Sequence, residues 1–165
     1  PNKLGEDILT IGLAAGLGKD CAIEAGGKCF TAPVIAPPLT LAECEAEQDK
    51  LGIKICEYDD YWAGAVKQCG GVSKMPTQAD LTELAKVLYN TSSINSSGWT
   101  ENLTLDPSKA SSLGFTGKSF HVWSGEEGDM GWAYYRAFAS SGTDWDYCAR
   151  NNSYNSFLQA VCIAD

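Results

Sequence analysis

The chain has 165 residues, of which 44% are hydrophobic, and a net charge of −9 from 21 acidic and 12 basic residues. This size and composition predict one domain that buries its own core without a structural metal. The negative charge argues against nucleic acid and anionic membranes as partners, because both attract a basic surface. The charge therefore predicts a partner with a neutral, basic or patchy surface. We expect this partner to be a protein or another macromolecule, and we expect no cofactor.

No apolar run approaches the roughly 20 residues that a helix needs to cross a bilayer. The longest candidate runs from Ile8 to Leu17 and is interrupted by Gly12 and Gly16. We therefore expect no membrane span in this sequence. The first residue is Pro1 and not Met, which leaves room for an upstream signal or anchor that is removed by processing.

Seven cysteines predict an oxidising compartment, and therefore an extracellular, cell-surface or virion location. Their spacing predicts three disulfides: Cys21–Cys29, Cys44–Cys56 and Cys69–Cys162. The third would close a loop of about 90 residues, which stabilises by about 4 to 5 kcal/mol in the chain-entropy model. A zinc site is disfavoured, because no cysteine pair has CxxC spacing and the chain has one histidine, His121.

Residues 1–57 read as a leader that attaches or displays the rest of the chain. Residues 1–38 are rich in Gly, Ala and Pro, which predicts irregular or weakly helical structure. Thr40 and Glu43 have capping-box spacing and predict a helix over 41–51. A strand-like IKIC follows before residue 57.

Residues 58–165 predict helices first and strands afterwards. Asp59 or Asp60 can cap a helix over 61–69, and Thr77 with Asp80 can cap a third. The apolar stripe of that third helix comprises Leu81, Leu84, Ala85 and Leu88.

A polar surface loop is predicted over 89–112, and strands are predicted at SFHVWS, GWAYYRAF and the terminal FLQAVCI. This order predicts an α+β domain with an antiparallel sheet.

The segment 123–157 holds nine of the seventeen aromatic residues, interleaved with Asn, Ser, Asp and Gly. Binding loops favour this mixture, because Tyr and Trp give a large contact area for little rotamer entropy while small polar residues adapt their hydrogen bonds. We expect Trp123, Trp132 and Phe157 in the core and the tyrosines beside Asp and Asn at the surface.

The motif order in residues 58–165 is KMPTQADLTEL, a polar loop, FHVWSGEE, GWAYYRAF, RNNSYNSF and QAVCI. This order resembles bacterial and phage surface modules with a C-type-lectin-like fold. It is most similar to the variable proteins of diversity-generating retroelements, whose C-terminal segment is rewritten by adenine-directed mutagenesis. The resemblance implies an α+β, disulfide-stapled lectin-like fold and a surface-displayed, ligand-binding protein. Residues 1–57 carry no such resemblance.

Randomised adenines in an Asn codon yield Asn, Ser, Asp, Tyr, Thr, Gly, Ala, His, Arg or Cys, among others, but never Trp, Lys, Glu, Gln or Met. The resemblance therefore implies twelve variable, ligand-facing positions: Asp129, Ala133, Tyr134, Tyr135, Ser140, Ser141, Asp144, Asp146, Tyr147, Asn151, Asn152 and Tyr154. It implies an invariant framework of Trp123, Gly125, Trp132, Trp145 and Phe157. Cys148 is then either a thiol produced by diversification or part of a structural bridge.

Other binding chemistries and catalysis are disfavoured. The calcium motifs of sugar-binding C-type lectins do not occur, and the acidic residues Glu126, Glu127 and Asp129 predict a solvated turn more readily than a cation site. No GxSxG, Walker A, HExxH or GxGxxG pattern occurs, and His121 is typical of a packed strand residue. We therefore expect no enzyme.

Two alternatives remain open. The first is an undiversified adhesin or pilus-like subunit of lectin-like fold, in which residues 1–57 bind a display or pilus partner. The second is a formylglycine-type enzyme, which needs a reactive cysteine pair. Cys148 and Cys162 lack the expected neighbours for that role.

Overall fold

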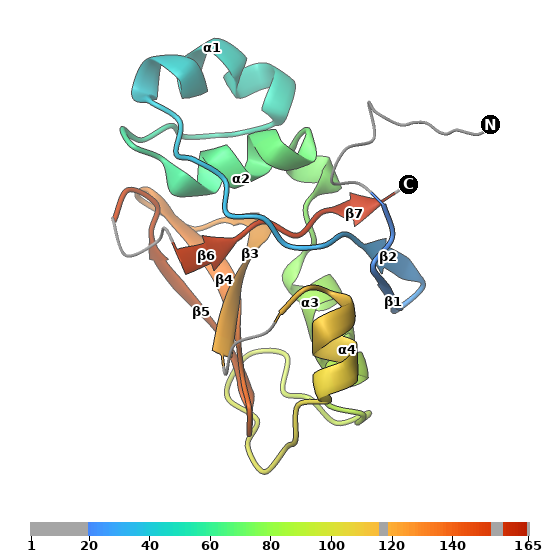
Figure 1. The fold of residues 1–165 in the computed structure, drawn as a ribbon. Helices are drawn as coiled ribbons and strands as arrows, with labels where there is room; N and C mark the ends of the chain where they lie inside the picture. The colour runs from blue at the N-terminus through green and yellow to red at the C-terminus, as the bar shows by residue number, and fades with distance from the viewer. Residues whose placement is uncertain (1–19, 116–118, 153–156, 165) are drawn as a thin grey trace, which may run out of the picture.

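Two β-sheets and four α-helices make up the described part of the chain (Figure 1). The computed structural model describes residues 20–115, 119–152 and 157–164. The elements are β1 (Ile23–Ala25), β2 (Lys28–Phe30), α1 (Leu41–Leu51), α2 (Tyr61–Cys69), the 3-10 helix η2 (Val72–Lys74), α3 (Gln78–Leu88), α4 (Pro107–Ser112), β3 (Ser119–Glu127), β4 (Trp132–Ala139), β5 (Thr143–Ala149), β6 (Leu158–Gln159) and β7 (Ile163–Ala164). The prediction of a mixed helix-and-sheet protein with disulfides is confirmed.

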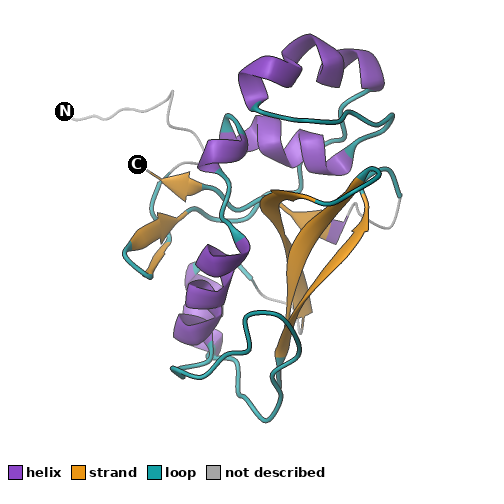
Figure 2. Cartoon of the chain, turned by 180° about the vertical axis from the view of Figure 1, so that it is seen from behind, coloured by secondary structure: helices purple, strands orange, loops and turns teal. Residues whose placement is uncertain are grey.

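The larger sheet has the strand order β5-β4-β3-β6, and the smaller sheet has the order β1-β2-β7. β3 and β4 are antiparallel neighbours, in agreement with the predicted antiparallel sheet, whereas β6 runs parallel to β3. β5 pairs antiparallel with β4 and is a strand that the sequence analysis did not predict. In Figures 1 and 2, α1 and α2 lie above the larger sheet, and α3 lies beside it. Because β5 is an edge strand, Trp145 and Tyr147 lie at the border of the sheet, whereas Trp132 and Tyr134 lie on the inner strand β4.

Helix α3 packs between the two sheets and fills one of two apolar clusters. Leu81, Leu84 and Leu88 of its predicted stripe are buried with Phe30 of the smaller sheet and Phe138 of the larger one. Burying large side chains between layers supplies the main stabilising free energy of such a fold. The stripe thus forms the core that joins the sheets.

Local capping signals explain where the helices begin and end. The Thr40 hydroxyl accepts from the Glu43 amide at 3.1 Å, while the Glu43 carboxylate accepts from the Thr40 amide at 2.9 Å. Thr77 and Asp80 make the same reciprocal pair before α3. Asp60, and not Asp59, caps α2. These predicted starts are confirmed because each depends only on residues three positions apart.

Four predicted segments are corrected. A β-hairpin, β1–β2, replaces the irregular or weakly helical structure expected within 20–38, and IKIC forms no strand. The loop 89–112 contains the unpredicted helix α4. The terminal FLQAVCI is not one strand, because it crosses from one sheet to the other and pairs first with β3 and later with β2.

Residues 20–57 pack onto the rest of the chain. The Thr31 amide donates to the Cys162 carbonyl at 2.9 Å, and the Thr31 hydroxyl accepts from the Cys162 amide at 2.9 Å. Leu39 and Asp60 exchange two backbone hydrogen bonds. Part of the predicted leader therefore contributes structure to the same fold, while its role in attachment or display stays a prediction.

The three disulfides join the cysteine pairs that the spacing predicts. Cys69–Cys162 spans 93 residues and fastens α2 to the segment between β6 and β7. Disulfides persist outside the reducing cytosol, which supports a non-cytoplasmic location. Within the described ranges, no helix has both the length and the apolar character that crossing a membrane requires.

Replacing Leu84 by alanine should lower the free energy of unfolding by about 2 to 5 kcal/mol, because it opens a cavity between α3 and the sheets. Urea unfolding followed by circular dichroism measures this loss. Ile35→Ala removes an exposed aliphatic side chain and should cost less than about 0.5 kcal/mol. Equal losses in the two variants would contradict the core assignment.

Candidate binding surface

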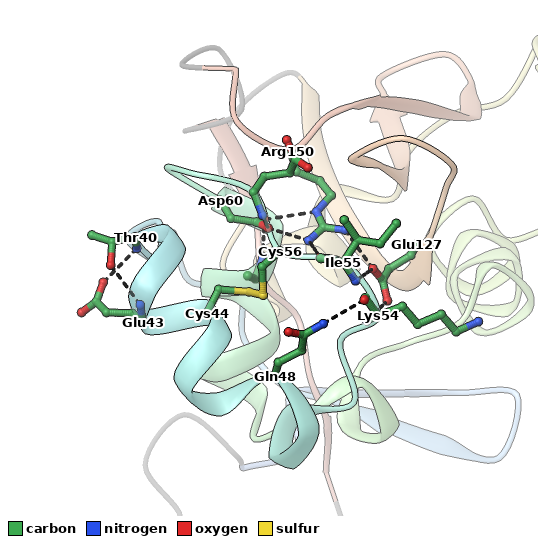
Figure 3. The surroundings of a disulfide bond; sticks show 12 residues. Thr40, Glu43, Cys44, Gln48, Lys54, Ile55, Cys56, Asp60, Glu127 and Arg150 are labelled. Atoms are coloured by element: carbon green, nitrogen blue, oxygen red, sulfur yellow. Dashed lines mark hydrogen bonds and ion pairs between the residues drawn. A yellow bond between two sulfur atoms is a disulfide. The ribbon is translucent and has the colours of Figure 1, made fainter.

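A fully buried arginine holds together the end of the larger sheet at which β3 turns into β4. Arg150 Nη2 lies 2.5 Å from Asp60 Oδ2, and Arg150 Nη1 lies 2.9 Å from Glu127 Oε1. The guanidinium carbon also lies 4.6 Å from the ring centre of Trp62. We call Asp60, Trp62, Glu127 and Arg150 the Arg150 network, whose three charged members are labelled in Figure 3. Its two carboxylates compensate the cost of burying the cation.

The Arg150 network fixes the loop between α1 and α2. Glu127 accepts from the backbone amides of Lys54 at 2.7 Å and Ile55 at 3.2 Å, and Arg150 Nη2 donates to the Ile55 carbonyl (Figure 3). These bonds explain why IKIC forms no strand, since its amides bind a carboxylate. The Cys44–Cys56 disulfide fastens the same loop to α1.

The same network fixes α2 and the turn before β4. Asp60 caps α2 by accepting from the Ala63 amide at 2.8 Å. The Arg150 backbone carbonyl accepts from the Tyr61 amide at 2.9 Å, and its amide donates to the Gly131 carbonyl at 3.0 Å. Four segments distant in sequence therefore meet at one arginine.

Sequence reasoning missed both buried arginines. Arg136 is also buried, and it donates to the hydroxyls of Thr143 at 3.1 Å and Thr82 at 3.3 Å, which joins β4 to β5 and to α3. The available signal was that Arg136 and Arg150 are the only Lys or Arg residues after Lys118. Isolated cations in an acidic, aromatic segment are good candidates for buried ion pairs or hydrogen-bonded networks.

The aromatic side chains of β4 and β5 lie on both faces of the larger sheet. On the face that continues from Phe138, four rings pack at tilted or T-shaped angles, with centres 5.0 to 5.8 Å apart. We call these rings the aromatic strip: Trp132, Tyr134, Trp145 and Tyr147. Its outer members, Trp132 and Tyr147, are exposed, while the inner two are half-buried. The strip therefore offers the rings of Trp132 and Tyr147 to solvent.

Tyr135 lies on the opposite face, because neighbouring strand residues alternate. Its ring packs against His121 at 5.6 Å and Trp123 at 6.3 Å between ring centres. Burial, followed by the charge of Asp146, raises the pKa of Tyr135 to about 12. Tyr135 therefore belongs partly to the apolar cluster and is less available to a ligand than Tyr147.

The twelve predicted ligand-facing residues do not form one patch. Asp129 and Ser140 lie at opposite ends of the eight-residue strand β4, about 25 Å apart at about 3.3 Å per residue. Six are exposed: Asp129, Ser140, Ser141, Asp146, Tyr147 and Asn152. Four are half-buried: Tyr134, Tyr135, Asp144 and Asn151. Tyr154 lies outside the described residues.

Ala133 is fully buried, which contradicts its predicted outward orientation. It faces the cluster around Trp62 and Trp123, because its side chain alternates with those of the aromatic strip. The predicted core position of Trp123 is confirmed. The predicted burial of Trp132 and Phe157 is wrong, since 40% and 67% of their surfaces are exposed.

The acidic turn is also corrected. Glu126 accepts from the Gln78 amide at 2.8 Å and Glu127 belongs to the Arg150 network, so neither is a solvated carboxylate. Asp129 is exposed, as predicted. In the part of the chain that the structure describes, no group of three or more His, Cys, Asp or Glu side chains could hold a metal ion.

Cys148 takes part in none of the three disulfides and is half-buried. Burial, with a smaller contribution from Asp146, raises the pKa of its thiol to about 12. A thiol with so high a pKa is a poor nucleophile at neutral pH. Cys162 is bonded to Cys69, so it provides no second thiol beside Cys148.

Comparisons of this chain with protein families, with curated proteins and with solved structures found no match. The functional assignment therefore depends on the geometry of the described residues.

Replacing Arg150 by methionine should lower the free energy of unfolding by about 3 to 5 kcal/mol, because it leaves the buried Asp60 carboxylate without its cation. Arg150→Lys keeps the charge but loses the forked geometry, so we expect a smaller loss. Urea unfolding at pH 7 measures both. A loss below about 1 kcal/mol for Arg150→Met would contradict a central role for the Arg150 network.

Burial lowers the pKa of His121. The unfolded chain therefore binds a proton more readily than the folded chain, and the contribution of His121 to stability is lost as pH falls below about 6.5. Between pH 7.5 and 5, the wild-type chain should lose more unfolding free energy than His121→Gln. Parallel pH profiles for the two proteins would contradict this linkage.

Proposed function

We propose that this protein is a surface-displayed ligand-binding protein with a C-type-lectin-like fold, whose C-terminal segment is diversified by a retroelement to alter its specificity. The single observation that supports binding best is the aromatic strip on β4 and the edge strand β5. Exposed Trp and Tyr rings are the residues that most often carry binding energy in protein interfaces.

The separation of buried and exposed residues supports diversification. The bonds that organise the β3–β4 end of the fold come from Asp60, Glu127 and Arg150, none of which is among the proposed variable positions. Asp146 and Tyr147 expose their side chains at the sheet edge, where replacement removes little buried surface. Exposed positions of this kind usually tolerate substitution within about 0.5 kcal/mol.

The two tryptophans of the aromatic strip fit a fixed role. Adenine-directed mutagenesis of an Asn codon cannot produce Trp, so Trp132 and Trp145 would persist in every variant. Tyr134 and Tyr147 pack against them and lie at exchangeable positions. Under this proposal, constant indole rings provide contact area while the residues between them set specificity.

The genomic locus provides a direct test of diversification. The proposal requires a nearby reverse transcriptase gene and a near-copy of the coding segment for residues 123–162 that differs at adenines. A complete locus without either would contradict diversification and favour the undiversified adhesin or pilus-like subunit. It would not contradict the proposal that the protein binds a ligand.

A display library tests whether the surface can be rewritten. We expect a library randomised at Asp129, Asp146, Tyr147 and Asn152 to be displayed on yeast at close to the wild-type level, because these side chains are exposed. Selection against lysozyme should then recover binders. Display and binding are both measured by flow cytometry.

The matched control is a library of the same size randomised at the buried positions Trp62, Leu84, Trp123 and Ala133, which should lose most of its display. Equal loss of display in the two libraries would contradict an exchangeable surface.

Single substitutions locate the binding energy. In a binder recovered from the library of exposed positions, which keeps Tyr134, the substitution Tyr134→Ala should weaken binding by about 1 to 3 kcal/mol and leave folding nearly intact. Tyr135→Ala should instead cost stability, because its ring packs on His121 and Trp123. Calorimetric titration and thermal unfolding separate the two effects. A melting temperature that falls equally in both variants would place Tyr134 in the core.

A further inference from the structure

Exposed apolar side chains from the variable segment and from the α1–α2 loop, which lies outside that segment, occur in the chain segments that meet at the β3–β4 end of the larger sheet. Five of them, between 40% and 89% exposed, form what we call the end patch: Ile55, Tyr58, Met130, Trp132 and Tyr147. They come from the α1–α2 loop, the turn after β3, and strands β4 and β5. Contiguous exposed apolar surface on a folded domain commonly marks an interaction site.

The contacts of the Arg150 network bring these segments together. The Arg150 side chain binds the Ile55 carbonyl while its backbone amide binds the Gly131 carbonyl. A Cβ atom at Gly131 would lie 2.8 Å from the Glu57 side chain, so the loop and the turn are in direct contact. Trp132 follows this turn, and its ring centre lies 5.0 Å from that of Tyr147.

Met130 is the most exposed of the five and has a left-handed backbone with φ of +57°. This conformation is unfavourable for a residue with a side chain, and glycine would adopt it more easily. Asp59 in the facing loop has φ of +49°. The exposed side chain of Met130 therefore adds no evident stability to the fold. Its flexible, polarisable thioether suits an adaptable contact surface.

The segments that carry the end patch are acidic. Residues 54–60, 128–132 and 144–150 contain six Asp or Glu and two Lys or Arg. Asp60 and Arg150 neutralise each other in the interior. Asp144 and Asp146 share the opposite face of the sheet with Tyr135, so three carboxylates remain against Lys54: Glu57, Asp59 and Asp129. Such a rim attracts cations and repels acidic partners.

We propose that the end patch docks a protein segment that presents apolar side chains flanked by lysine or arginine. This inference rests on the proposed binding function and extends it in two ways. It adds Ile55, Tyr58 and Met130 to the contact surface, and it gives the partner a chemical class. The apolar side chains cover the rings and Met130, and the cations pair with the carboxylate rim.

A random twelve-residue peptide library, displayed on phage and selected against the whole chain, tests the inference. We expect selected peptides to combine aromatic or aliphatic residues with Lys or Arg. Synthetic versions should bind Met130→Gly and Tyr58→Ser at least fivefold more weakly than wild type. Met130→Gly fits the backbone φ of +57°, so its melting temperature should equal or exceed that of wild type.

Charge is tested with matched variants. Asp59→Asn with Asp129→Asn should weaken binding and flatten its salt dependence. Ile35→Ser and Glu24→Gln change exposed residues of the same chemistry elsewhere on the fold and should leave binding unchanged. A loss as large in these controls as in the patch variants would overturn the inference, since it would show general attraction to an acidic, apolar surface.

Two further outcomes separate this inference from the proposed function. Peptides that lose affinity on Tyr134→Ala and Tyr147→Ala, but not on Met130→Gly or Tyr58→Ser, would overturn the end patch and leave the aromatic strip as the binding site. Selected peptides without basic residues would overturn the partner class. Peptides insensitive to all four substitutions would contradict both proposals.

Discussion

The fold depends on one buried cation. Arg150 is enclosed by Asp60 and Glu127 and packs on Trp62, and these contacts join the α1–α2 loop, the start of α2, the end of β3 and the end of β5. Taking an arginine out of water costs free energy, and here carboxylates and a carbonyl that accept from its donors compensate that cost. The Arg150 network therefore fixes the β3–β4 end of the molecule, where it bonds directly to the backbone of Ile55 and Gly131.

The arrangement separates residues that hold the fold from residues that meet solvent. Strand alternation places Trp123 and Ala133 on the buried face that packs on Trp62. It places Tyr134 and Tyr147 on the opposite face of the sheet. Buried arginines on β4 and at the end of β5 fasten the strands from within. The outward side chains of β5 can then change with little effect on packing, which is the physical condition that a diversified binding surface must meet.

The sequence predicted what depends on near neighbours. Thr40 with Glu43, and Thr77 with Asp80, fixed helix starts because a capping box spans three residues. It could not predict contacts across the chain. Lys54 and Ile55 form no strand, because their backbone amides donate to the Glu127 carboxylate, which lies 73 and 72 positions away in the sequence. For the proposed binding surface, composition identified an aromatic segment but not the face that each residue occupies. Ala133 was therefore predicted at the surface although it is buried, and Trp132 was predicted in the core although it is exposed.

Thermal unfolding of two variants tests the central claim most directly. In one, Asp129, Asp146, Tyr147 and Asn152 are replaced together by serine; in the other, Arg150 alone is replaced by methionine. If the interior network carries the fold and the outward residues do not, the fourfold variant melts close to the wild-type temperature and well above Arg150→Met. A fourfold variant that melts at or below Arg150→Met would contradict this division.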